Sequence, residues 1–136
     1  MTDEFPITIY HNPDCGTSRN TLAMIEAAGH TPKVVEYRNV GWTRPLLDEL
    51  LAAMGVAPRD VMREKGTPAA ELGLLDPSIR EETIIEAMLA HPILVNRPIV
   101  VTPKGTKLCR PSEVVLELLD RKPPRFTKED GEVVSL

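Results

Sequence analysis

The sequence predicts an α/β fold with a mixed four-stranded sheet, built from a βαβ half and a ββα half that a helical insertion separates. Three observations lead to this prediction. Strand, helix and strand patterns follow one another over residues 7–37. Residues 43–91 have a helical spacing of apolar side chains, and two further strand patterns and a last helix pattern fill residues 99–119.

The βαβ half is predicted from two short apolar strand patterns, at residues 7–10 and 33–37. The helix between them ends at Gly29, and Ser18 or Thr17 is its predicted N-cap. A crossover helix of this length makes the two strands parallel. The turn after the first strand therefore lies at the carboxyl edge, where open α/β sheets bind ligands.

The insertion is predicted as an all-helical block over residues 43–91. Its first helix has a shared apolar face made of Leu46, Leu47, Leu50, Leu51 and Met54. A short helix around residues 60–63 ends at Gly66. Ser78 followed by Glu81 is the pattern of a capping box at the start of the last helix of the block.

The ββα half is predicted as a hairpin followed by a helix. Residues 99–101 and 106–109 alternate in polarity around a turn at Lys104 and Gly105. Pro111 and Ser112 then open an amphipathic helix pattern over residues 114–119. A βαβ unit followed by a ββα unit is the arrangement of the thioredoxin-like fold.

Pro98 stands directly before the third strand. By analogy with that fold, it is a candidate for a cis-proline that faces the active thiol. Because most X–Pro bonds are trans, an ordinary trans proline at the first residue of a strand is the alternative.

Length and composition predict one domain and exclude two classes of partner. With 136 residues and 42% hydrophobic content, we expect a single domain over residues 1–136, with a loosely held tail from about residue 121 to 136. A net charge of −4 and only one Trp, two Tyr and two Phe argue against nucleic-acid binding. The acidic start and the absence of an apolar run of about 18 residues argue against a signal peptide and a membrane span, so we expect a cytoplasmic monomer.

Cys15 lies in the turn between the first strand and the helix, and this position predicts a reactive thiolate. The first N–H groups of a helix lack intrahelical partners and the helix dipole adds positive charge, so a thiol pKa there falls from about 8.5 toward about 3.5–7.5. The same N–H groups and Arg19 favour an incoming oxyanion. Asn12, Gly16 and Thr17 are predicted to support this site.

His11 and Ser18 flank Cys15 and bear on its mechanism. A charged His11 favours the thiolate, whereas a neutral imidazole only hydrogen-bonds the loop, and the sequence leaves both alternatives open. Ser18 occupies the position where thioredoxin-like CxxC proteins have their second cysteine. An external thiol must therefore resolve any intermediate formed on Cys15.

Cys109 is interpreted as a small buried hydrophobe in the hairpin, with an internal resolving thiol as the alternative. In a reducing cytosol the two cysteines are a reactive thiol and a bystander rather than a disulfide. The three histidines and two cysteines show no metal-ligand spacing, so we predict no metal.

Four motifs, in this order and spacing, carry a family resemblance: HNPDCGTSRNTL at 11–22, VMR at 61–63, HPILVNRPIVV at 91–101 and LCRPSEV at 108–114. Over residues 7–117 the chain resembles the glutaredoxin-linked bacterial arsenate reductases. The resemblance implies that Cys15 is the catalytic nucleophile and that Arg63, Arg97 and Arg110 surround the arsenic oxyanion. It also implies reduction of arsenate to arsenite with glutathione as co-substrate, glutaredoxin as partner and no bound cofactor.

The residues themselves give a weaker argument for the three arginines. A guanidinium binds tetrahedral oxyanions through paired N–H donors, but Arg63, Arg97 and Arg110 lie in separate segments. For any one of them, a surface charge or a salt bridge is the alternative. Arg97 is the exception, because its apolar neighbours indicate burial, and a buried arginine needs an anion or a hydrogen-bond network.

Three rival hypotheses come from other classes. A tyrosine-phosphatase-like enzyme is disfavoured because three residues, rather than five, separate Cys15 from Arg19. A non-enzymatic regulator on the same fold, of the kind that binds RNA polymerase, uses a CxxC switch that Ser18 removes. An arsenate-inactive, glutathione-dependent thiol reductase stays open.

Overall fold

The computed structural model describes residues 5–122, 126–128, 130–131 and 133–134. The chain divides into two compact units. We call residues 1–36 with 97–136 the sheet unit, and residues 37–96 the helical unit. The prediction of a single domain with an insertion over residues 43–91 stays a prediction.

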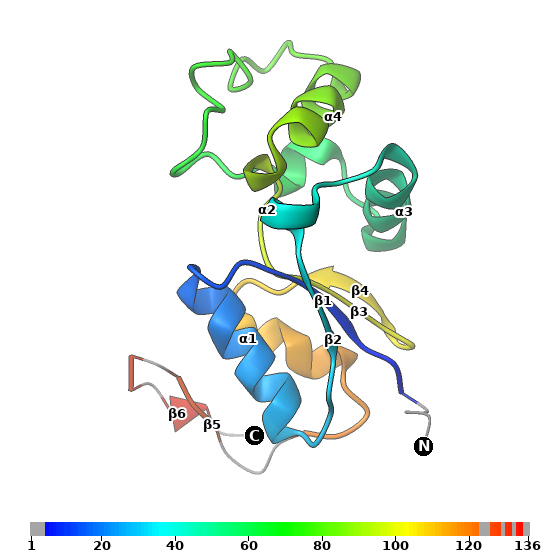
Figure 1. Cartoon of the computed structure of the whole chain (residues 1–136), viewed down its shortest axis with the longest axis vertical. Helices are drawn as coiled ribbons and strands as arrows, with labels where there is room; N and C mark the ends of the chain where they lie inside the picture. The colour runs from blue at the N-terminus through cyan, green and yellow to red at the C-terminus, as the bar shows by residue number, and fades with distance from the viewer. Residues whose placement is uncertain (1–4, 123–125, 129, 132, 135–136) are drawn as a thin grey trace. The chain divides into compact units, whose positions relative to one another are not determined.

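A four-stranded mixed sheet is the centre of the sheet unit, in the order β2-β1-β3-β4 (Figure 1). Its strands are β1 (Thr8–His11), β2 (Lys33–Glu36), β3 (Ile99–Thr102) and β4 (Gly105–Leu108). β1 pairs parallel with β2 and antiparallel with β3, and β3 pairs antiparallel with β4. The predicted parallel crossover, the hairpin and the mixed four-stranded sheet are thus confirmed.

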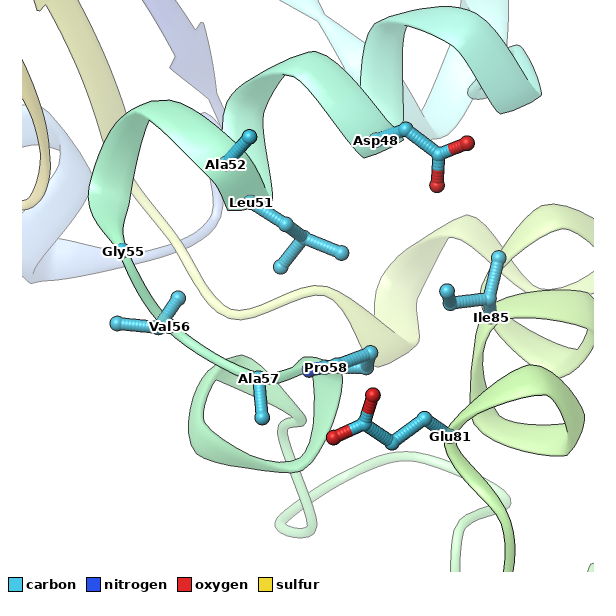
Figure 2. A pocket seen from close by; sticks show the side chains of 9 residues that line it. All are labelled: Asp48, Leu51, Ala52, Gly55, Val56, Ala57, Pro58, Glu81 and Ile85. Atoms are coloured by element: carbon cyan, nitrogen blue, oxygen red, sulfur yellow. The ribbon is translucent and has the colours of Figure 1, made fainter.

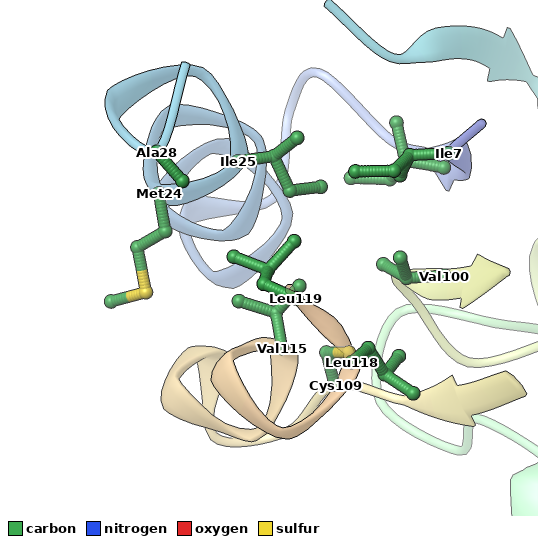
Figure 3. Close-up of a cluster of buried hydrophobic side chains, with 10 residues drawn as sticks. Ile7, Met24, Ile25, Ala28, Val100, Cys109, Val115, Leu118 and Leu119 are labelled. Atoms are coloured by element: carbon green, nitrogen blue, oxygen red, sulfur yellow. The ribbon is translucent and has the colours of Figure 1, made fainter. Parts of the chain in front are cut away.

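Two helices cover one face of this sheet: α1 (Gly16–Ala27) and the 3₁₀ helix η3 (Ser112–Leu118) (Figure 1). One buried cluster joins these helices to the sheet, and Figure 3 shows its side chains, among them Met24 and Ile25 from α1, Val115 and Leu118 from η3, and Val100 from β3. All five are at most 1% exposed, so they form a continuous core. This core fixes α1, and with it the turn that precedes α1.

The start of α1 differs from the prediction. Neither Ser18 nor Thr17 is the N-cap, because the helix begins at Gly16 with Cys15 as its N-cap residue. The Cys15 carbonyl already accepts the first helical bond from the Arg19 N–H, at 3.0 Å. The end is as predicted, since α1 stops before Gly29, which has the positive φ of 93° that a glycine adopts without strain.

The helical unit contains α2 (Tyr37–Val40), α3 (Arg44–Met54), η1 (Pro58–Val61), α4 (Glu81–Ala90) and η2 (Pro92–Leu94). Thr43 caps α3 by accepting a hydrogen bond from the Leu46 N–H, and Leu47, Leu50 and Leu51 are the buried part of the predicted apolar face. Tyr37 stacks on Trp42 with ring centroids 5.0 Å apart. The second strand is therefore shorter than predicted, because Tyr37 belongs to a helix.

Two predictions for the helical unit are wrong. Ser78 forms no capping box, because its N–H and hydroxyl both donate to Asp76 Oδ1 and Arg80 is the N-cap of α4. The short helix lies at residues 58–61 rather than 60–63, since Pro58 favours the first position of a helix. Arg63 consequently lies outside it.

The last helix and the tail also differ from expectation. The last helix, η3, is a 3₁₀ helix; it begins at Ser112 with Pro111 as its N-cap residue, in agreement with the prediction that these two residues open it, and it ends one residue before the predicted end. In the tail, β5 (Phe126–Thr127) and β6 (Val133–Val134) pair antiparallel, which the sequence analysis did not predict. The predicted loose tail also includes residues 123–125, 129, 132 and 135–136, which lie outside the described residues. Among the helices of the described part, none combines the length and hydropathy needed to cross a bilayer.

Candidate active site

Cys15 lies where β1 has ended and α1 begins. The chain turns there because the Cys15 N–H donates to the Asn12 carbonyl at 3.0 Å. Cys15 has extended backbone angles, and its side chain is 8% exposed. The thiol therefore lies at the N-terminus of a twelve-residue helix, at the edge of the sheet that the sequence predicted.

The surroundings of Cys15 stabilise its thiolate. Burial raises the pKa of the thiol, but the Ser18 N–H and the guanidinium groups of Arg97 and Arg110 outweigh burial and bring the pKa down to about 7. The Ser18 N–H stabilises the thiolate form of Cys15, although the Cys15 side chain does not form a regular N-cap hydrogen bond. A substantial fraction of Cys15 is therefore ionised at neutral pH.

Arg110 and Arg97 come together at Cys15 from the two ends of the β3–β4 hairpin. Arg110 Nη1 lies 3.7 Å from Cys15 Sγ and donates to the Arg97 carbonyl at 2.9 Å. Arg97 is buried, as its neighbours predicted. Within the described residues, its Nε and Nη1 atoms meet no hydrogen-bond acceptor, while its guanidinium interacts with Cys15.

Both of these arginines precede a cis peptide bond. The Arg97–Pro98 bond is cis, which decides the alternative that the sequence left open. The Arg110–Pro111 bond is also cis, and sequence analysis missed it. Only a fold analogy singled out Pro98, and no comparable analogy pointed to Pro111.

His11 and Ser18 form a buried hydrogen-bonded pair behind the turn. His11 Nδ1 and Ser18 Oγ are 2.6 Å apart, and Ser18 Oγ also accepts from the Asn12 N–H at 3.1 Å. Burial lowers the pKa of His11, Arg19 lowers it further, and Glu36 opposes the shift. The neutral imidazole that hydrogen-bonds the loop is thus favoured over the charged form.

Of the other predicted site residues, Arg19 bonds to the backbone of the turn, whereas Gly16 and Thr17 lie in the first turn of α1. Arg19 Nη1 donates to the Pro13 carbonyl at 2.7 Å, so this exposed guanidinium is already committed to the loop. Thr17 accepts from the Thr21 hydroxyl through its carbonyl, at 2.8 Å. Gly16 is the first residue of α1.

Arg63 belongs to the helical unit, and it forms hydrogen bonds with residues of that unit. Its N–H donates to the Leu94 carbonyl at 2.7 Å, next to the isolated bridge between Met62 and Val95. Arg63 Nη1 donates to Asn96 Oδ1 at 3.4 Å. A place for Arg63 beside Cys15 stays a prediction.

Comparison with known proteins identifies the family. The model of the ArsC family matches residues 10–118. The chain belongs to the ArsC family.

Relatives of this ArsC chain match over nearly their whole length. Arsenate reductase ArsI1 of Synechocystis sp. is 59% identical over 135 residues, 98% of this chain and 93% of that protein. Arsenate reductase of Escherichia coli K12 is 54% identical over 129 residues, 94% of this chain and 92% of that protein. The solved structure of arsenate reductase from Vibrio cholerae has a TM-score of 0.81 and 37% identity, covering 86% of this chain and 100% of that chain. The family resemblance and the predicted thioredoxin-like fold are confirmed.

Cys109, the second thiol of this ArsC protein, differs from Cys15 in its surroundings. It is fully buried in the core, and the structure shows both cysteines as free thiols. Burial, with a smaller contribution from Glu117 against Lys107, raises the pKa of Cys109 to about 12. The interpretation of Cys109 as a small buried hydrophobe is confirmed.

The described part of the ArsC chain has a pocket but no group of side chains that could hold a metal. In the described part of the chain, no three His, Cys, Asp or Glu side chains form a group that could hold a metal. A pocket of about 410 Å³ lies within the helical unit. Figure 2 shows its lining, which includes the apolar side chains of Leu51 and Ile85 and the carboxylates of Asp48 and Glu81. It contains none of the predicted site residues.

Proposed function

We propose that this protein reduces arsenate to arsenite through a covalent adduct on Cys15. One observation carries the proposal: a thiol with a pKa of about 7 at a helix N-terminus, next to the guanidinium groups of Arg97 and Arg110. Such a site combines a nucleophile with donors for a tetrahedral oxyanion. Relatives of 54–60% identity named arsenate reductase support arsenate as that oxyanion.

In the first step the Cys15 thiolate attacks the arsenic atom of arsenate. A sulfur–arsenic bond forms and one arsenic–oxygen bond breaks. The departing oxygen takes protons from the arsenate and from solvent and leaves as water, while arsenic stays pentavalent. Arg97, Arg110 and the first N–H groups of α1 stabilise the charge on the remaining oxygens. We propose that Arg63 also binds these oxygens, as the family resemblance implies.

The later steps use two external thiols, because Ser18 stands where a neighbouring resolving thiol would be. The thiol of glutathione displaces a second oxygen as water, so arsenic is bonded to two sulfurs. A glutaredoxin thiolate then attacks the glutathione sulfur and forms a mixed disulfide. The electron pair of the broken sulfur–arsenic bond stays on arsenic, which becomes trivalent. Hydrolysis releases arsenite and regenerates the Cys15 thiol.

This scheme assigns the remaining partners. Glutathione is a co-substrate, no bound cofactor is required, and electrons arrive as thiols. A monomer suffices, because one chain supplies the nucleophile and the arginines. Such thiols are kept reduced in the cytoplasm, so we propose a cytoplasmic reaction.

The test follows arsenate-dependent NADPH oxidation in two assays, one with glutathione, glutathione reductase and glutaredoxin, and the other with thioredoxin and thioredoxin reductase. We expect turnover with glutaredoxin and little with thioredoxin. Turnover with thioredoxin alone would contradict the glutathione steps and leave arsenate reduction intact. No arsenate-dependent turnover with either donor would contradict the proposed function and favour a thiol reductase, which a glutathione mixed-disulfide substrate would then reveal.

A further inference from the structure

The C-terminal hairpin formed by β5 and β6 contacts the segment that carries Arg110. Lys128 follows β5, and its carbonyl accepts a hydrogen bond from the Gly131 N–H at 2.9 Å, within the turn of the hairpin. Lys128 Nζ lies 2.6 Å from Glu113 Oε1 in η3. The hairpin is therefore joined to the start of η3 by a close ion pair.

This ion pair is more buried than a comparable pair on the same helix. The side chain of Lys128 is 11% exposed and that of Glu113 is 31% exposed. The pair of Lys107 and Glu117 is 3.3 Å apart, with side chains that are 44% and 62% exposed. Water screens exposed pairs, and partial burial strengthens the attraction between charges. We therefore expect the pair of Lys128 and Glu113 to restrain the chain more strongly than the pair of Lys107 and Glu117.

Glu113 also contacts Ser112, which lies two residues after Arg110 in the chain. The Ser112 hydroxyl, which is buried, donates to Glu113 Oε1 at 2.9 Å. On the other side of Arg110, the Cys109 N–H donates to the Pro98 carbonyl at 2.9 Å. Contacts of its neighbours thus flank Arg110 on both sides in the chain.

We propose that Lys128 is a positioning residue that holds Arg110 against Cys15 through Glu113. The contact of Arg110 Nη1 with Cys15 Sγ is 3.7 Å long, and a small displacement of the backbone breaks it. Removing the ammonium group leaves the partly buried Glu113 carboxylate without its cation, which destabilises this arrangement. The catalytic consequence rests on the proposed function, but the effect on the Cys15 thiol does not.

The experiment compares Lys128→Met with the conservative Lys128→Arg and with the matched control Lys107→Met. The first readout is the rate of Cys15 alkylation by iodoacetamide between pH 5 and 9, without arsenate. If loosening of Arg110 raises the pKa of Cys15 by about half a unit, Lys128→Met reacts about threefold more slowly at pH 6. Lys128→Arg and Lys107→Met keep the wild-type profile. The second readout is kcat/KM for arsenate, which we expect to fall by a similar factor in Lys128→Met alone.

Each outcome decides the matter. A wild-type alkylation profile in Lys128→Met, or an equal slowing in Lys107→Met, would overturn the positioning role. If the wild-type protein does not reduce arsenate but Lys128→Met is still alkylated more slowly than wild type, the proposed function is contradicted and the positioning role is supported. If Lys128→Met fails to fold by circular dichroism, Glu113→Gln replaces it, because it keeps an acceptor for Ser112 and removes only the charge.

Discussion

The two cysteines of the sheet unit are both buried, yet their surroundings differ. Cys15, at the start of α1, has two guanidinium groups and a helix N–H close to its sulfur, and its pKa is about 7. Cys109, directly after β4, packs among apolar side chains and has a pKa of about 12. Burial raises the pKa of both thiols, so burial alone does not decide reactivity. The donors placed around the sulfur do.

The largest expected difference concerns selective labelling. At pH 6.5 a thiol with a pKa of about 7 is roughly one quarter ionised, whereas a thiol with a pKa of about 12 is ionised by only a few parts per million. We expect iodoacetate to label Cys15 and leave Cys109 unmodified in the native protein, as measured by peptide mass spectrometry. The rate should rise about tenfold per pH unit below pH 6 and level off above pH 8, because the thiolate is the reacting form. Equal labelling of both cysteines would contradict the conclusion that their surroundings give them different reactivities.

Replacement of the nucleophile Cys15 should have the next largest effect. Cys15→Ser should lose arsenate reduction by on the order of 10⁴-fold or more, because a hydroxyl stays protonated at neutral pH and cannot undergo thiol exchange. Steady-state assays with glutaredoxin measure the loss. Residual activity above about 1% of wild type would mean that another residue forms the adduct.

The third prediction changes the cation beside Cys15. Arg110→Lys keeps the charge but loses the planar fork, so kcat/KM for arsenate should fall by roughly tenfold to a hundredfold. The same substitution at Arg63 should be milder if that arginine mainly positions product. Wild-type kinetics in Arg110→Lys would remove Arg110 from the site.

The smallest effect on activity is expected when Cys109, the thiol outside the site, is replaced. Cys109→Ser should keep arsenate reduction within about twofold of wild type, because Cys109 is outside the chemistry. It should lower the midpoint of thermal unfolding by a few degrees, since it buries a hydroxyl in an apolar core at a cost of about 1–3 kcal/mol. Accumulation of an arsenic adduct without glutathione in this variant would make Cys109 the resolving thiol instead.

The sequence predicted the parts of the fold that local periodicity determines. The strands, the parallel crossover and the hairpin follow from apolar alternation and from turn residues, and the reactive turn follows from a cysteine between a strand and a helix. The predicted N-cap of α1 was wrong. Ser18 is a residue type that often caps helices, but here its hydroxyl bonds to His11 and to the Asn12 N–H. The capping box failed for a similar reason, since Ser78 bonds locally to Asp76.

Other features depend on contacts between segments distant in the chain. Nothing local shows that Arg97 and Arg110 reach a sulfur more than 80 residues earlier in the sequence. The pair of Lys128 and Glu113 also joins helix η3 to the segment that follows β5, and no sequence pattern connects them. Tertiary packing decides such contacts, and in this chain only the family resemblance anticipated the arginines.

The hydroxyl of Ser18 has a consequence for how the protein holds electrons. A dithiol turn stores two reducing equivalents and passes them on by closing a disulfide within itself. Here the corresponding position is an alcohol already bonded to His11 and to the Asn12 N–H, so the turn has no such store. In the proposed scheme both electrons of each turnover therefore come from external thiols that reach Cys15, and the expected rate depends on the concentration of those thiols.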